Sequence, residues 1–173
     1  TSTVAGTANV VAATDGLTDS VEVAFEHGGA VGVDLDPDMT TVTAGDVVTY
    51  ALMAEDGFGN TWPVTDEASF SIQDEAGGTL LANLYTSEIA GTWAVSGTYN
   101  SLTATGVLTV EHAAAADLLL TPDPESVTAG QSVTYTLTAT DTFGNPWNAT
   151  EDGLYTIDDD AGGVFTDNVY LSE

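Results

Sequence analysis

The sequence predicts an all-β chain built from tandem two-sheet sandwiches. Three observations carry this prediction: an ungapped internal repeat of 85 residues, alternating apolar residues within each repeat, and turn residues at short intervals. No stretch of the chain has a convincing helical periodicity. About seven short strands in each repeat, separated by regular turns, are typical of a sandwich of two β-sheets.

The repeat is defined by four pairs of segments that match without any insertion. Both members of each pair lie 85 residues apart, and chance does not plausibly produce four such matches in one phase. The pairs are 42–50 with 127–135, 58–60 with 143–145, 83–85 with 168–170, and 26–27 with 111–112.

The phase of the repeat divides the chain into three parts. Residues 31–115 form one complete repeat, whereas residues 116–173 match only the first part of a repeat. Residues 1–30 match the last part, which carries the last two strands. We therefore expect one complete sandwich flanked by two complementary fragments. The alternative is that the chain, which begins at a threonine, is a processed product or a piece of a longer array whose ends are arbitrary.

Alternating apolar residues and turns place the strands in order. The clearest strand is predicted over 46–54, with one row of inward-facing side chains: Val48, Tyr50, Leu52 and Ala54. The fragment 1–30 is expected to form strands over 6–14 and 17–26. The remaining strands of the complete repeat are expected near 31–35, from Trp62 through Phe70 to Ile72, within 79–87, over 92–99 as the central strand with a core aromatic, and over 102–111.

The composition excludes several classes of function. The chain has 27 acidic residues, no lysine or arginine, and a formal net charge of −27. Without basic residues it cannot neutralise phosphates, so we expect no nucleic-acid partner. No apolar run approaches the roughly 18 residues of a membrane span, so no membrane insertion is expected. Because the charge also repels other copies, high salt, divalent cations or both must offset it.

Two motifs recur in this phase, a Thr-Ala-Gly turn followed by a Tyr-x-Leu strand and an Asp-x-Phe-Gly-Asn turn, and an Ala-Gly-Thr-Trp segment occurs once, beginning at Ala90. They resemble the immunoglobulin-like repeats of bacterial and archaeal surface adhesins of the invasin and intimin type. The resemblance covers the whole chain and implies immunoglobulin-like sandwiches at an extracellular or cell-surface location. Such repeats serve as stalks, fibres, spacers or receptor-binding tips, and the fold alone does not choose among these roles.

Calcium is the one cofactor that the sequence suggests, because carboxylate oxygens are its preferred ligands. The alternatives are turns capped by an aspartate side chain and solvated acidic loops, which need no metal. The candidate ligands are Asp56 and Asp141 in the two Asp-x-Phe-Gly-Asn turns, Asp74 with Glu75, and the run Asp158, Asp159 and Asp160.

No nucleophile elbow, HExxH motif or Gly-rich phosphate loop is present, so we do not expect an enzyme. His27 and His112 are interpreted as polar residues at strand ends rather than as pH sensors or metal ligands. Trp62 and Trp147 could stack on a sugar, or they could cover one end of a sandwich. Asn148 begins the only N-glycosylation sequon and is expected in a loop.

Two functional hypotheses remain. The first is a structural unit of an extracellular filament, stalk or sheath, and the alternative is an adhesin module that binds a glycan or a host surface protein. In the first hypothesis, copies associate head to tail as residues 1–30 of one chain add strands to residues 116–173 of the next, unless the continuing polypeptide fills that place. The predicted assembly residues are Ala8, Val10 and Ala12 on the donor and Leu154 and Phe165 on the acceptor.

Overall fold

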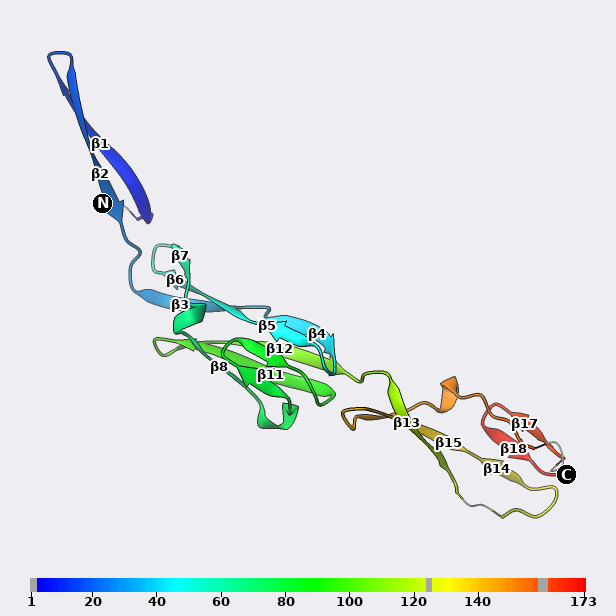
Figure 1. The fold of residues 1–173 in the computed structure, drawn as a ribbon. Helices are drawn as coiled ribbons and strands as arrows, with labels where there is room; N and C mark the ends of the chain where they lie inside the picture. The colour runs from blue at the N-terminus through cyan, green and yellow to red at the C-terminus, as the bar shows by residue number, and fades with distance from the viewer. Residues whose placement is uncertain (1–2, 124–125, 159–161) are drawn as a thin grey trace.

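The computed structural model describes residues 3–123, 126–158 and 162–173. It shows an extended row of three parts, with a hairpin at the N-terminal end, a sandwich in the middle and further sheets at the C-terminal end (Figure 1). The described residues form strands and short 3-10 helices, with no α-helix among them. The predicted all-β class is therefore confirmed.

The N-terminal hairpin consists of β1 (Gly6–Thr14) and β2 (Leu17–Phe25), as the sequence predicts. Its two-residue turn has positive φ at both positions, 49° at Asp15 and 78° at Gly16, which suits the right-handed twist of the two strands. Among the described strands, β1 and β2 pair only with each other. An isolated two-stranded hairpin is marginally stable in water, so this element depends on a partner.

The middle sandwich contains three sheets. Two short 3-10 helices, η1 (Thr65–Glu67) and η2 (Asp74–Ala76), join its strands. The first sheet has the spatial order β3 (Ala30–Asp36), β6 (Ala51–Asp56) and β7 (Thr61–Pro63). The second has the order β5 (Val47–Thr49), β10 (Leu84–Thr86) and β9 (Thr79–Leu81). The third has the order β4 (Met39–Thr43), β12 (Leu102–Glu111), β11 (Gly91–Tyr99) and β8 (Ser69–Ile72).

The core of the middle sandwich draws side chains from all three sheets. The predicted inward row of residues 48, 50, 52 and 54 is confirmed, since none of these side chains is more than 6% exposed. Trp93 of β11 packs against this core, which confirms the expected central strand with a core aromatic. Close packing of both faces is what stabilises a two-layer sandwich of this size.

Two strand predictions are wrong in detail. The strand expected over 46–54 breaks at Tyr50, where β5 ends in one sheet and β6 begins in another. At the break, Tyr50 N donates to Asn83 O and Asn83 Nδ2 donates to Tyr50 O, both at 2.8 Å. The strand expected from Trp62 to Ile72 is divided into β7, η1 and β8, and β4 was not predicted. Alternation records which face is buried but does not record a change of sheet.

The described residues of the C-terminal part form six strands and one 3-10 helix, η3 (Thr150–Asp152). Their two sheets correspond to the first two sheets of the middle sandwich. In spatial order they are β13 (Ala115–Thr121), β15 (Thr136–Asp141) and β16 (Pro146–Asn148), and β14 (Ser132–Thr134), β18 (Val169–Leu171) and β17 (Val164–Thr166).

No described strand of the C-terminal part corresponds to the four-stranded sheet of the middle sandwich. Residues 126–128 and 154–157 stand 85 positions after parts of β4 and β8, yet neither segment is a strand. In the middle sandwich β4 pairs with β12 and β8 pairs with β11. The described C-terminal sheets therefore form one layer, and no described strand covers their inner face.

Candidate functional site

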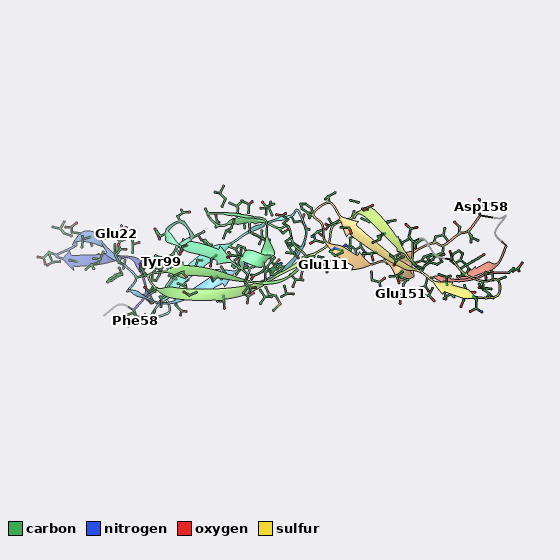
Figure 2. All side chains as sticks on the ribbon, turned by 90° about the horizontal axis from the view of Figure 1, so that it is seen from below. Glu22, Phe58, Tyr99, Glu111, Glu151 and Asp158 are labelled. Atoms are coloured by element: carbon green, nitrogen blue, oxygen red, sulfur yellow. The ribbon has the colours of Figure 1, made fainter. Side chains whose placement is uncertain are left out.

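An apolar groove with a volume of about 580 Å³ lies on the uncovered face of the C-terminal sheets. Figure 2 marks this end of the chain with Glu151 and Asp158. The side chains that dominate the groove are Leu118, Leu120, Leu137, Trp147, Leu154 and Phe165. The two acceptor residues predicted from the sequence, Leu154 and Phe165, thus lie in a single groove.

Several leucines of the groove are more exposed than their counterparts in the middle sandwich. Leu120 is 42% exposed, whereas Leu35, 85 positions earlier, is 2% exposed. Leu154 is 92% exposed. Because each apolar side chain of this size gains about 1.5–3 kcal/mol when fully buried, the groove is a face on which further apolar burial is favourable.

One wall of the groove is an aromatic cluster around Phe165. The centroid of its ring lies 5.3 Å from that of Tyr170, 5.9 Å from that of Tyr155 and 6.0 Å from that of Tyr135. All three pairs are tilted, which is a favourable arrangement for aromatic rings. The cluster holds Phe165 in position at the groove.

One face of the N-terminal hairpin is mainly apolar. Ala8, Val10 and Ala12 alternate along β1, and their opposite partners on β2 are Val23, Val21 and Asp19. Directly opposite residues of an antiparallel pair share a face, so two rows of mainly apolar side chains lie together. Val10 is 56% exposed and Val21 is 60% exposed. The predicted donor residues therefore share one exposed face.

The hairpin has the same register as the two central strands of the middle sandwich and differs in length only in that β12 is one residue longer than β2. Gly6 lies opposite Phe25 and Thr14 opposite Leu17, as Gly91 lies opposite Val110 and Tyr99 opposite Leu102. Each of these partners is 85 positions from its counterpart. Val10 thus stands where Val95 stands, and Val95 is 1% exposed.

The junctions that join the three parts use the same side-chain contact. Asn145 Nδ2 donates to Glu88 O at 2.9 Å, and Asn145 Oδ1 accepts from Ala90 N at 2.8 Å. The corresponding bonds at the other junction, both 2.9 Å, join Asn60 to Thr3 O and Ala5 N. The same pair of asparagine hydrogen bonds therefore joins the hairpin segment to the middle sandwich and the middle sandwich to the C-terminal sheets.

Each of these turns is organised by a buried aspartate. The carboxylate of Asp141 accepts bonds from the N–H groups of Ala113 and Phe143 and from both N–H donors of Asn145. Burial raises the pKa of Asp141, but these hydrogen bonds, led by that of the Asn145 side chain, outweigh it and lower the pKa to about 2.

The carboxylate of Asp56 makes the same four contacts in the other turn. The Asn60 side chain is the largest cause of its low pKa; burial opposes it, and three backbone N–H groups add to it. In both turns N–H donors surround the carboxylate, which favours the capped-turn interpretation over a calcium site, since Ca²⁺ is held by oxygen ligands alone.

Among the other acidic candidates, Asp74, Glu75 and Asp158 are exposed. Asp74 and Glu75 lie in η2 and Asp158 follows the segment 154–157, while Asp159 and Asp160 lie outside the described residues. Within 3–123, 126–158 and 162–173, no three histidine, aspartate or glutamate side chains group closely enough to hold a metal ion. Calcium at the 158–160 run stays a prediction.

The two histidines stack on two of the three tryptophans, a contact that sequence reasoning missed. His27 lies on Trp62 with ring centroids 3.5 Å apart, and His112 lies on Trp147 at 3.6 Å. The imidazole covers one face of each indole. Trp62 also packs against the middle core, and Trp147 lines the groove. These contacts favour tryptophans that cover a sandwich end over tryptophans that stack on a sugar. The only available signal was that both residue types recur 85 positions apart.

Asn148 ends β16 instead of lying in a loop, so that part of its prediction is wrong. Its side chain is exposed, and its Oδ1 accepts a bond from Thr150 N at 2.9 Å. Glycosylation of this residue stays a prediction. None of the described residues belongs to a helix with the length and hydropathy that a bilayer crossing requires.

No family model matches the chain, and no curated protein matches it either. Among solved structures it is similar to FdeC, an Escherichia coli adhesin, with a TM-score of 0.54 and 21% identity over 81% of this chain and 52% of that one. It therefore spans about half of that structure. Domains 4–9 of the surface layer protein SbsC match with a TM-score of 0.34 and 16% identity over 97% of this chain and 31% of that one. The fold shared with the adhesin is the immunoglobulin-like β-sandwich.

Proposed function

We propose that this chain is a structural segment of an extracellular surface fibre. In this fibre the N-terminal hairpin of one copy fills the apolar groove of the next copy. The observation that carries the proposal is the match between the hairpin and the missing layer: β1 and β2 have the register and apolar face of β11 and β12 and nearly their length. The fold shared with a surface adhesin supports a location outside the cell.

Backbone pairing supports this arrangement. In the middle sandwich β12 pairs in parallel with β4, and β11 pairs with β8. In a filled groove β2 would pair with residues 126–128 and β1 with residues 154–157, which form no strand alone. Addition of strands to an open edge supplies main-chain hydrogen bonds that specify direction, so the fibre would grow head to tail.

Side-chain volumes also support it. At the position of Val95 the donor keeps a valine, Val10, but at the position of Trp93 it has only Ala8. The acceptor has the larger residues Leu154 and Phe165 at positions occupied by Ser69 and Leu80 in the middle sandwich. Phe165, whose counterpart Leu80 packs against the middle core, would refill part of the volume lost on the donor, whereas Leu154 stands at the position of the exposed Ser69.

The charge of the chain sets a condition for assembly. Copies with a formal charge of −27 repel one another in dilute buffer. Salt screens the repulsion between exposed charges that lie farther apart than about 10 Å at 0.1 M and about 3 Å at 1 M. We therefore expect association only at high ionic strength or with calcium. The proposed role requires no catalytic group.

The test is sedimentation of the full chain in concentrated NaCl, with and without CaCl2. We expect concentration-dependent polymers that disappear when residues 1–30 are removed. Val10→Asp should also abolish association, because it would bury an unpaired charge in the groove. The matched control is Val11→Asp, on the opposite face of the same strand and 63% exposed, which should leave association unchanged.

Two results would contradict the proposal. One is a full chain that remains a compact monomer at high concentration and salt. The other is a chain without residues 1–30 that still polymerises, which would mean that another surface joins the copies. Filaments seen by negative stain without added ligand would separate this function from that of a glycan-binding module.

A further inference from the structure

The junction between the middle sandwich and the C-terminal sheets contains a second contact beyond the Asn145 bonds. The ring of Phe143 lies over Gly45 in the turn 43–46. A Cβ atom placed on Gly45 would lie 2.8 Å from the ring, so only glycine leaves room for it. Gly45 also has φ +98°, a conformation that suits glycine. The ring and the turn thus pack in direct contact.

The residues for the same contact are present at the two ends of the chain, but apart from each other. Phe58 stands where Phe143 stands and is 67% exposed, against 38% for Phe143. Figure 2 shows Phe58 beside the hairpin, at the opposite end of the chain from Asp158. Gly130 stands where Gly45 stands, has φ +82°, and has no atom within 4 Å of its Cβ position. The ring of Phe58 is therefore exposed, and no side chain covers the turn at Gly130.

We infer that Phe58 of one copy packs on the turn 128–131 of the neighbouring copy. This inference rests on the proposed function, because the hairpin must occupy the groove for the two surfaces to meet. It commits to a second copy of this chain as the partner. The contact would be a copy-to-copy version of the one between Phe143 and Gly45.

The hydrogen bonds around the turn explain why the surfaces meet. Gly45 N donates to Ser87 O, and Glu88, which Asn145 bonds, is the next residue. Gly130 N donates likewise to Ser172 O. When the hairpin fills the groove, the Thr3 segment bonded by Asn60 comes to lie beside Ser172. The turn 128–131 then lies under the ring of Phe58.

The consequence is a defined angle between successive copies. A hairpin in a groove anchors two copies, and the hydrogen bonds of Asn60 and Asp56 to the segments around the hairpin oppose rotation of its middle sandwich. A ring seated on the turn adds a contact on a second element, and two separate contacts restrict that rotation. Every junction along the fibre, within a chain or between chains, would then have the same geometry.

The first experiment compares Phe58→Ala with Phe143→Ala by sedimentation of the full chain in concentrated NaCl. Phe58→Ala should weaken association roughly ten-fold, since it removes apolar contact area only between copies. Because Phe58 is largely exposed, the variant should fold normally. Phe143→Ala, the matched control, alters the junction within one chain and should leave the association constant unchanged.

The second experiment uses the absence of cysteine from the chain. A Phe58→Cys, Gln131→Cys double variant treated with a short bismaleimide should give a ladder of covalent multimers. The control pair Phe143→Cys with Asp46→Cys should crosslink only within a chain. If copies associate but residues 58 and 131 do not crosslink, or Phe58→Ala associates like the original chain, the inference fails and the proposed function stands. If no copies associate at all, the proposed function itself fails.

Discussion

The middle sandwich and the C-terminal sheets share a sequence pattern but differ in burial. Leu52 is fully buried between two layers, whereas Leu137, its counterpart, is only half-buried at the floor of the groove. The difference lies in the covering layer, because β11 and β12 have no described counterpart over the C-terminal sheets. The comparison shows that a row of inward-facing apolar side chains forms a core only where strands from elsewhere in the fold cover it.

The C-terminal sheets nevertheless keep part of a core. Ala139 is 1% exposed, and Tyr170 is 6% exposed. These residues lie on strands that pair with neighbours within their own sheets. One layer therefore holds its strands together while its inner face stays open.

The largest expected effect is the difference in the free energy of unfolding between the variants Leu52→Ala and Leu137→Ala. In the middle sandwich the substitution should lower the free energy of unfolding by about 2–5 kcal/mol, because it leaves a cavity in a packed core. In dilute chains Leu137→Ala should cost about 1 kcal/mol or less, since the groove is already open. Guanidinium denaturation followed by circular dichroism measures both.

The control for this pair is Leu81→Ala, at a site 75% exposed in the middle sandwich, which should change stability little. Equal losses at Leu52 and Leu137 in dilute chains would mean that the groove is already closed in solution.

A second, intermediate effect concerns backbone protection. Amides of residues 154–157 should exchange rapidly with deuterium in dilute chains, because no strand pairs with this segment. Exchange should slow when copies associate, whereas β8, already paired with β11, should stay protected throughout. Mass spectrometry of peptides from the two segments compares them in one sample. Rapid exchange at 154–157 in fully associated chains would argue against pairing with β1.

The smallest effect concerns acid. The pKa of Asp141 is about 2 in the folded chain, below the 3.8 of an unperturbed aspartate. A depressed pKa means that the carboxylate stabilises the fold above about pH 4 and that this contribution is lost as the pH falls toward 2. Thermal unfolding between pH 5 and pH 2 should therefore become easier, and Asp141→Asn should flatten that dependence. Identical pH profiles for the two chains would contradict this role of the turn.

Much of the strand pattern is predictable, and the errors have physical causes. The strands of the hairpin and β11 and β12 are long, regular and bounded by turns, so alternation locates them almost to the residue. The break at Tyr50 is invisible in the pattern because the inward row continues through it. β4 was missed because its parallel pairing with β12 involves residues distant in sequence.

The candidate site was likewise only partly predictable from the sequence. The phase of the repeat was enough to select Phe165, because its counterpart Leu80 packs against the core of the middle sandwich. Leu154 was selected by its size, since its counterpart Ser69 is exposed. The stacking of histidine on tryptophan and the contact between Phe143 and Gly45 were missed. Both join residues that recur in phase, but recurrence does not say which recurring residues meet.

The sequence by itself determined the all-β class, the inward rows of the strands and the absence of basic residues. These properties follow from local alternation and composition, which require no knowledge of neighbours in space. Only the tertiary structure decided that β1 and β2 stand apart from the C-terminal sheets and that the groove stays open within one chain. Whether two complementary segments meet depends on the path of the chain between them, and here the middle sandwich separates them (Figure 1).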